Sequence, residues 1–293
     1  MNAIELTGAL GGRWMGQYGL AFCPAHHNTN TPALSISRGA DGRLLFYCHA
    51  GCPFPAICNA LRDLGMIDGP PREPQMDGGE LARLQAEALR KADKRAQQAR
   101  AIWDEARPIE NTVAEFYLRH RAITCALPDT LRFHPACWHP SGQRLPAMVA
   151  IVQGSEHFAV HRTFLRADGT GKAEEAPAKA MLGTVAGGAV RLTKGNGALV
   201  VAEGIETALS LASGLLKVSA TTWATLSTSG MSGVRLPAEP GRLTIATDGD
   251  GPGQAAGNAL AERAVALGWT VSLLPAPHGR DWNDILKNNG VAA

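Results

Sequence analysis

Four acidic side chains in the C-terminal third of the chain have the types and positions needed for metal chemistry. Glu203, Asp248 and Asp250 each come shortly after a short apolar run, and Asp281 opens the segment DWND. Because the carboxyl ends of parallel strands meet at one edge of a sheet, we expect these carboxylates to lie close together. Neighbouring carboxylates repel one another, and a hard divalent cation relieves that repulsion. The pattern therefore predicts a Mg²⁺ site for phosphate chemistry.

Short apolar runs alternate with helix-like segments around these carboxylates, as a βαβ architecture requires. We expect strands at residues 198–202, 223–226, 243–246 and 270–274, and helices at residues 204–213 and 255–267. The run of small residues at 227–233 is expected to be a loop that approaches a ligand.

The segment DGDG at residues 248–251 is also typical of a plain turn. A calcium-binding loop would carry a Glu at its twelfth position, where this chain has Ala259, so the calcium interpretation fails. A plain turn explains neither the Glu203 that precedes it nor the Asp281 that follows it. The combination favours the magnesium site.

Three segments of this region resemble the Toprim domain, the metal-dependent fold of bacterial-type primases, topoisomerases and some nucleases. They are VAEGIETA at 201–208, DGDGPGQAA at 248–256 and DWND at 281–284, and the resemblance covers residues 197–293. They are most similar to primase-like proteins of phages, plasmids and integrated elements. The resemblance implies that Glu203 is an acid/base or metal partner. It also implies that Mg²⁺ or Mn²⁺ is held, directly or through water, by Asp248, Asp250 and Asp281.

Thiol and imidazole side chains near the N-terminus form two pairs with the spacing of a zinc ribbon. Cys23 and His26 belong to the motif CPAH, and Cys48 and Cys52 belong to CHAGC, with 21 residues between the two motifs. Thiolate and imidazole suit tetrahedral Zn²⁺. We expect strands at residues 34–36 and 44–47, joined by a hairpin turn at 39–42. The metal would then close the ends of these loops and serve a structural role.

The fourth zinc ligand is open from the sequence alone, because the second pair has three intervening residues where the commonest ribbon has two. His27, His49 and Cys58 are alternatives. The motif CPAH with the following TPALSI also resembles the N-terminal zinc-binding domain of DNA primases. Both ends of the chain therefore resemble one family.

Composition indicates a protein with more than one domain and a substantial core, since 45% of its 293 residues are hydrophobic. Neither a signal peptide nor a membrane-spanning run is evident, so we expect a cytoplasmic protein. Six cysteines are too few for a disulfide scaffold, and we expect them to be reduced. A net charge of +2 is too small to predict nucleic-acid binding without local basic patches.

Residues 80–107 follow a Pro-rich break at 69–74 and alternate in charge, which favours a long exposed helix acting as a linker. Beyond it, we expect a helix at residues 113–118 and neighbouring strands at 147–152 and 158–165. This region therefore reads as a small α+β subdomain.

Three basic side chains of the subdomain, Arg162, Lys172 and Lys179, are candidates to face a template or a nucleoside triphosphate, or are ordinary exposed hairpin residues. A phosphate-binding P-loop is excluded, since Arg166 stands in place of its first Gly and Ala173 in place of its hydroxyl residue.

We therefore expect an α/β protein in four parts: a zinc ribbon at 1–68, a linker helix at 69–107, an α+β subdomain at 108–196 and a Toprim parallel sheet with flanking helices at 197–293. The resemblance implies a DNA primase-like nucleotidyltransferase that makes short RNA primers. Its partners would be single-stranded DNA, ribonucleoside triphosphates and, where one is used, a replicative helicase, with no membrane. A Toprim nuclease and a non-catalytic replication-accessory protein that binds DNA are the alternatives. The exposed aromatics Phe46 and Tyr47 either stack on template bases or form the core of the ribbon.

Overall fold

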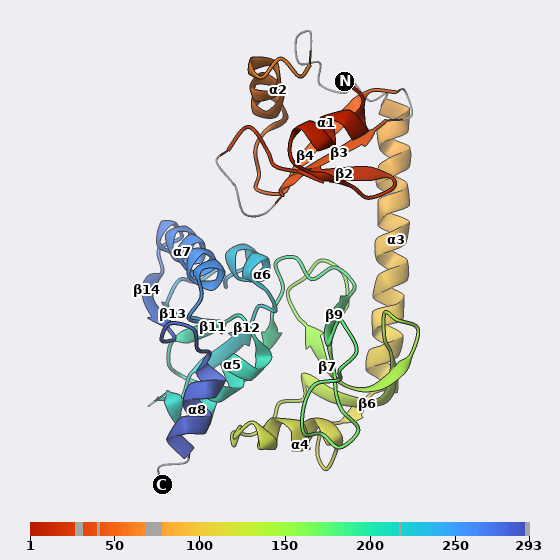
Figure 1. The fold of residues 1–293 in the computed structure, drawn as a ribbon. Coiled ribbons are helices and arrows are strands. Elements are labelled where there is room, and N and C mark those ends of the chain that lie inside the picture. Colours follow the sequence, from red (N-terminus) through yellow and green to blue (C-terminus); the bar gives the residue numbers. More distant parts are fainter. Residues whose placement is uncertain (27–31, 40–41, 68–77, 217, 291–293) are drawn as a thin grey trace. The chain divides into compact units, whose positions relative to one another are not determined.

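The computed structural model describes residues 1–26, 32–39, 42–67, 78–216 and 218–290 (Figure 1). It divides into two compact units, Met1–Arg83 and Leu84–Ala293. The predicted Pro-rich break at 69–74 and the middle of the predicted hairpin turn, residues 40–41, lie outside the described residues. Within the described part of the chain, no helix combines the length and apolar character needed to cross a membrane.

The first unit is a four-stranded antiparallel sheet in the order β1-β2-β3-β4 with two helices. The elements are α1 (Ala3–Ala9), β1 (Arg13–Trp14), β2 (Tyr18–Ala21), β3 (Leu34–Arg38), β4 (Leu44–Cys48) and α2 (Phe54–Asp63). Alternate residues of β3 are buried, and Leu34 and Ile36 pack with Leu6 of α1 and Leu61 of α2. The two strands predicted for the ribbon are confirmed as β3 and β4.

Helix α3 (Gly78–Glu105) confirms the long helix expected from the charge pattern, but it is not exposed along its whole length. Ala99, Ile102 and Trp103 are buried and pack against Val149 and Phe164 of the following sheet. The expectation of an exposed linker was therefore wrong for the last two turns. Their apolar residues recur at three- and four-residue spacing, which places them on one helix face.

The second unit begins, after α3, with a five-stranded antiparallel sheet in the order β5-β6-β7-β8-β9. Its elements are β5 (Arg107–Pro108), α4 (Val113–His120), β6 (Leu131–Trp138), β7 (Arg144–Val152), β8 (Ala159–Phe164) and β9 (Lys179–Leu182). Side chains alternate across the sheet: Val149 packs toward α3, whereas Met148 and Ala150 pack with Tyr117 of α4. The α+β character expected for this region is confirmed.

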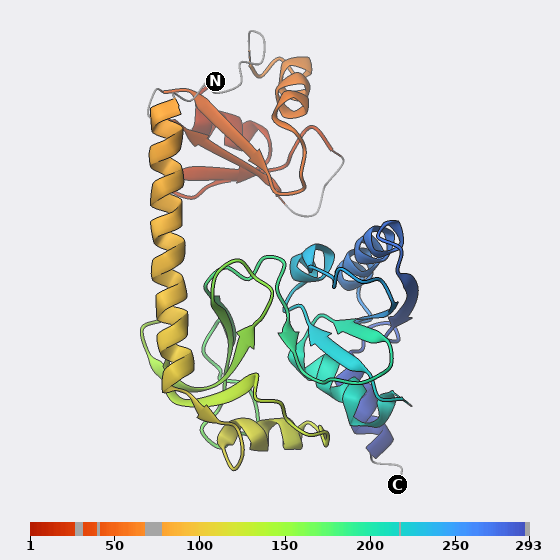
Figure 2. The ribbon, with the colours of Figure 1, turned by 180° about the vertical axis from the view of Figure 1, so that it is seen from behind.

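A second five-stranded sheet follows, in the order β10-β12-β11-β13-β14, and all of its strands are parallel except β10. The elements are β10 (Val190–Arg191), β11 (Leu199–Ala202), α5 (Ile205–Ser210), η1 (Leu211–Leu215), β12 (Thr221–Ala224), α6 (Thr228–Gly233), β13 (Arg242–Thr247), α7 (Gly251–Ala266), β14 (Thr270–Pro275) and α8 (Trp282–Gly290). Helices cover both faces of this sheet, with α5 and α8 on one and α6 and α7 on the other (Figures 1 and 2). The α/β class and the mostly parallel C-terminal sheet are confirmed.

One expected element of this sheet was wrong. Residues 227–233 were expected to be a loop, but Ser227 accepts a hydrogen bond from the Gly230 N–H and caps the short helix α6. A run of Ser, Thr and Gly has poor helix propensity, and here a side-chain cap and the burial of Met231 outweigh it.

Candidate functional site

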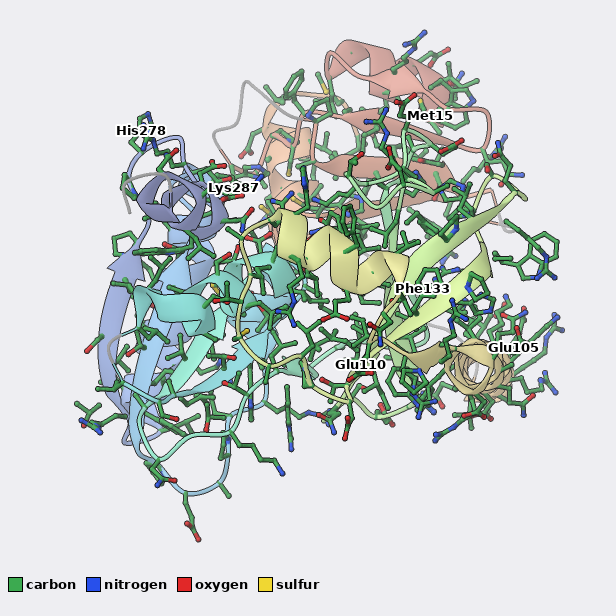
Figure 3. All side chains as sticks on the ribbon, turned by 90° about the horizontal axis from the view of Figure 1, so that it is seen from below. Met15, Glu105, Glu110, Phe133, His278 and Lys287 are labelled. Carbon is green, nitrogen blue, oxygen red and sulfur yellow. The ribbon has the colours of Figure 1, made fainter. Side chains whose placement is uncertain are left out.

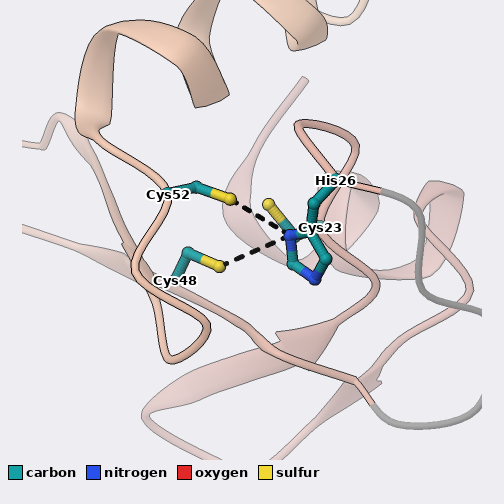
Figure 4. Close-up of side chains that lie close together, drawn as sticks. All are labelled: Cys23, His26, Cys48 and Cys52. Carbon is teal, nitrogen blue, oxygen red and sulfur yellow. Dashed lines mark hydrogen bonds between the residues drawn. The ribbon is translucent and has the colours of Figure 1, made fainter. Parts of the chain in front are cut away.

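Four sulfur and nitrogen ligands meet at the end of β4. The ligand atoms of Cys23, His26, Cys48 and Cys52 all lie within 4.8 Å of one another (Figure 4). His26 Nδ1 lies 3.1 Å from Cys52 Sγ and 3.8 Å from Cys48 Sγ. Cys23 follows β2 and Cys48 ends β4, so the antiparallel sheet itself brings the two sequence pairs together. The structure therefore gathers the four residues predicted as zinc ligands.

The thiols of this cluster change one another's pKa values. Burial raises the pKa of Cys23 to about 12, and the neighbouring Cys48 adds to the rise. Burial also acts to raise the pKa of Cys48, but hydrogen bonds from the backbone of Cys52 and Ala50, together with those from the Cys23 and Cys52 thiols, lower that pKa. Three thiols and a partly buried imidazole, whose Nε2 has no partner, form a donor set that fits tetrahedral Zn²⁺.

Two of the three alternative fourth ligands make other contacts, and the third lies outside the described residues. His49 Nε2 lies 2.8 Å from the Ser35 hydroxyl, and Cys58 is buried on α2 beside Arg62. His27 lies outside the described residues. Cys52 is therefore the fourth member of the cluster.

The carboxylates of the second unit meet at the carboxyl edge of the parallel sheet. Ala202 of β11 pairs with Ala246 of β13, so Glu203 and Asp248 leave neighbouring strands at nearly the same level. Both side chains are partly buried. Burial raises the pKa of Glu203, and the charges of Asp248 and Asp250 raise it further. Like charges at this edge therefore oppose one another, as the sequence predicts.

Asp281 joins the same cluster from the loop before α8. Burial raises the pKa of Asp248, and the next largest cause is the charge of Asp281. Among the described residues, the Cys/His set is the group of three or more such side chains placed to hold a metal ion, and the four carboxylates do not form such a group. Mg²⁺ does not require all four at once, since it binds one or two carboxylates and completes its shell with water and phosphate.

Two of these carboxylates also cap the N-termini of helices. Asp250 Oδ1 accepts a hydrogen bond of 2.8 Å from the Gly253 N–H at the start of α7. Asp281 Oδ1 accepts one of 2.8 Å from the Asp284 N–H at the start of α8. Each carboxylate thereby satisfies an N–H group that has no partner within its helix. The turn interpretation of DGDG therefore describes part of what Asp250 does.

A buried carboxylate that the sequence analysis missed lies beside this edge. Glu206 of α5 is almost fully buried, and its Oε1 accepts a hydrogen bond of 2.9 Å from the Tyr117 hydroxyl. Its Oε2 accepts one of 3.0 Å from Lys179, and Lys172 Nζ lies 3.7 Å from Oε1. Burial acts to raise its pKa, but the two lysines outweigh that effect and hold it far below its usual range. Its position in the first turn of the helix that follows Glu203 was the available signal.

The two lysines link this buried carboxylate to the acidic edge. Burial and the neighbouring carboxylates raise the pKa values of Glu203 and Asp248, and the positive charge of Lys179 acts in the opposite direction on both without outweighing them. Each lysine side chain is about one third exposed, 34% for Lys172 and 36% for Lys179. Donors that a phosphate can reach therefore lie beside carboxylates that a cation can bridge.

Arg162 lies apart from this group, on the opposite face of the sheet, and its expected role in facing a template or a nucleotide stays a prediction. His161, the preceding residue of β8, faces the lysines, and burial together with Lys179 lowers its pKa to about 4. Successive side chains of a strand point to opposite faces, so Arg162 points toward α3 with Phe164. It is 6% exposed, and its Nη1 donates a hydrogen bond of 2.7 Å to the Trp138 carbonyl.

Comparisons with known families match two parts of the second unit. Residues 198–292 match a Toprim domain, and residues 93–192 match a domain of unknown function, DUF7146. No curated protein matches the sequence significantly.

Two solved structures are similar to the chain at low identity. The zinc-binding and RNA polymerase domains of the Aquifex aeolicus primase share 13% identity over 99% of this chain and 80% of that chain, with a TM-score of 0.41. A DNA primase domain from Pseudomonas aeruginosa shares 16% identity over 53% of this chain and 52% of that chain, with a TM-score of 0.34.

Proposed function

We propose that this chain, whose residues 198–292 form a Toprim domain, is a DNA primase-like nucleotidyltransferase that makes short RNA primers on single-stranded DNA. The observation that carries the proposal is that Glu203 and Asp248 follow neighbouring parallel strands, with Lys172 and Lys179 paired to Glu206 beside them. A nucleoside triphosphate with its divalent cation needs both kinds of group at once, cationic donors for phosphate oxygens and carboxylates for the metal.

The carboxylates would hold Mg²⁺ or Mn²⁺, and the raised pKa values of Glu203 and Asp248 support a cation at this edge, since it would relieve their mutual repulsion. Asp248, Asp250 and Asp281 are the proposed ligands, and Glu203 binds the metal or exchanges a proton. Such a cation would activate the primer 3′-hydroxyl and neutralise charge on the triphosphate. Lys172 and Lys179 bind and orient the phosphates.

The first unit would hold structural Zn²⁺ at Cys23, His26, Cys48 and Cys52 and contact the template. Tyr47, which is 65% exposed, is the proposed stacking residue. Phe46 is only partly exposed, because it packs on the core of this unit and stacks on Phe54 at 6.2 Å between ring centroids. The proposed partners are single-stranded DNA and ribonucleoside triphosphates, with a replicative helicase where one delivers the template.

The test is incubation of the full chain with single-stranded DNA, labelled ribonucleotides and Mg²⁺ or Mn²⁺. The informative variant is Asp250→Asn, because Asn also caps helices and should preserve the start of α7. Glu262→Gln is the matched control, since it removes an exposed acidic charge from the same helix.

Labelled oligonucleotides from the wild type and from Glu262→Gln, but not from Asp250→Asn, would support the primase. Metal-dependent degradation of the template would instead identify a nuclease that uses the same carboxylates. Template binding with neither reaction would identify a replication-accessory protein and overturn the proposal.

A further inference from the structure

A cavity of about 510 Å³ opens on the face of the β5–β9 sheet opposite the Glu206 cluster. One wall is the end of α3, with Ile102 and Glu105, and the other is the β6–β7 hairpin, with Trp138 and Arg144. Figure 3 labels Glu105 at the end of α3 and Phe133 on the neighbouring strand β6. The volume lies within the usual range of small-molecule sites, roughly 300–1,000 Å³.

The hairpin wall presents a flat aromatic and cationic surface. Trp138 is 51% exposed although it is a large apolar side chain, and the Arg144 guanidinium lies 4.2 Å from its ring centroid. Arg144 Nη1 also donates to the Ala136 carbonyl, which fixes the guanidinium beside the indole. Planar rings stack on indole faces and on guanidinium planes. The wall is therefore suited to a planar aromatic ligand.

The inner wall carries a buried positive charge. Arg162 is more than nine-tenths buried and lines the cavity, yet its Nε has no hydrogen-bond partner. Among the described residues, no carboxylate lies within ion-pair distance of its guanidinium. A buried charge without a counter-ion is costly, and an anion in the cavity would relieve that cost.

The acidic residue that lines the cavity already contacts a histidine side chain. Glu105 lies 3.1 Å from His134 Nε2 and, among the described residues, forms no ion pair with Arg144 or Arg162. Arg144 and Arg162 thus give the cavity a cationic side, and Trp138 gives it an aromatic side. A ligand that joins a planar ring to a negative charge complements both.

We propose that this cavity binds a nucleotide, with its base stacked on the Trp138–Arg144 surface and its phosphate on Arg162 and Arg144. The ligand is either a free mononucleotide or one unit of a single strand, since both offer the same base and phosphate. The site lies on the other side of the sheet from Glu203 and Asp248, so it does not depend on the proposed catalytic function.

Binding is tested on the full chain without added divalent cation, so that the acidic edge contributes little. One titration uses a fluorescent oligodeoxythymidylate of about 12 nucleotides, within the usual site size of single-strand binders. The other uses a fluorescent ATP analogue. The variants are Trp138→Leu and Arg144→Gln. Their controls are Phe116→Leu, an exposed aromatic on α4, and Lys287→Gln, an exposed cation on α8.

Each cavity variant is expected to weaken binding about tenfold, the effect of losing one stacked base, while the controls stay within about twofold. If the cavity variants lose affinity only for the ATP analogue, the cavity is a mononucleotide site. If they lose affinity for the oligonucleotide, it is a site for a single strand. Unchanged affinity of both variants for both ligands overturns the proposal, whether or not primers are made.

A direct measurement covers the case in which a variant fails to fold. Wild-type protein is photocrosslinked to a 5-iododeoxyuridine oligonucleotide and to an azido-ATP, and the modified peptides are mapped by mass spectrometry. Label on the β6–β7 hairpin around Trp138 supports the site. Label found only elsewhere in the chain overturns it.

Discussion

The Glu206 carboxylate of α5 accepts a hydrogen bond of 3.0 Å from the Lys179 ammonium of β9, which joins the Toprim domain to the preceding sheet. We predict that Glu206→Gln lowers the free energy of unfolding by about 2 kcal/mol. Breaking a fully buried ion pair costs about 3–5 kcal/mol, and here both lysines are partly solvated. Urea unfolding measures the change. Glu174→Gln, which breaks the exposed pair with Arg166, should change it by less than about 0.5 kcal/mol.

The charged groups around Glu206 also predict that the folded protein is less stable at low pH. The pKa of His161 is lowered from 6.5 to about 4, so the unfolded chain binds a proton that the folded chain does not between these values. Stability should therefore fall as pH drops below 6.5, by up to about 1.4 kcal/mol per pH unit. The lowered pKa of Glu206 adds a further loss as pH drops below its ordinary value of 4.5. Unfolding curves recorded from pH 7 to 4 check the slope, which His161→Leu should reduce. A flat profile in the wild type, or an equal slope in His161→Leu, would contradict the prediction.

Much of the fold follows from local signals in the sequence. The apolar runs before Glu203 and Asp248 predict strands β11 and β13, and the spacing of Cys23 and Cys48 predicts their convergence. Local signals do not reveal tertiary partners. Nothing near Glu206 in the sequence shows that Lys179 will pair with it.

Strand phase is a second property that the sequence leaves open. Arg162 is on a correctly predicted strand, but which face a residue occupies depends on what packs on each side. Because α3 covers one face of this sheet, Arg162 is buried toward α3 while His161 faces the lysines. The sequence alone does not show that the last turns of α3 pack on this face.

Removing a charge from the acidic edge should stabilise the fold. We predict that Asp248→Asn raises the free energy of unfolding by about 1 kcal/mol, because burial and the charge of Asp281 both oppose the ionised form of Asp248. Mg²⁺ should raise the melting temperature of the wild type and have little effect on the variant. Calorimetry with and without Mg²⁺ checks both expectations, and a variant less stable than the wild type would contradict the repulsion.

Loss of a thiol from the Cys/His cluster should affect the first unit alone. We predict that Cys48→Ser removes bound zinc and unfolds Met1–Arg83, because metal binding supplies folding energy in so small a unit. Elemental analysis and limited proteolysis check this, with protection expected to persist in Leu84–Ala293. Cys125→Ser, a thiol of the second unit, should keep its zinc. Full zinc content in Cys48→Ser would remove that residue from the ligand set.

Gly249 lies between the proposed metal ligands Asp248 and Asp250, and its backbone contacts the loop that precedes Asp281. Its N–H donates a hydrogen bond of 2.9 Å to the Arg280 carbonyl, and an added Cβ would lie 2.0 Å from the Pro277 carbonyl oxygen. Because the obstructing atoms are backbone, we predict that Gly249→Ala displaces the loop before Asp281, destabilises the protein by about 1–3 kcal/mol and abolishes the response of its melting temperature to Mg²⁺. Gly251→Ala is the control, since an added Cβ there meets nothing within 4 Å, and its stability should match or slightly exceed the wild type. If Gly249→Ala and Gly251→Ala have equal stability and an equal response to Mg²⁺, the loop before Asp281 does not pack against Gly249 as described.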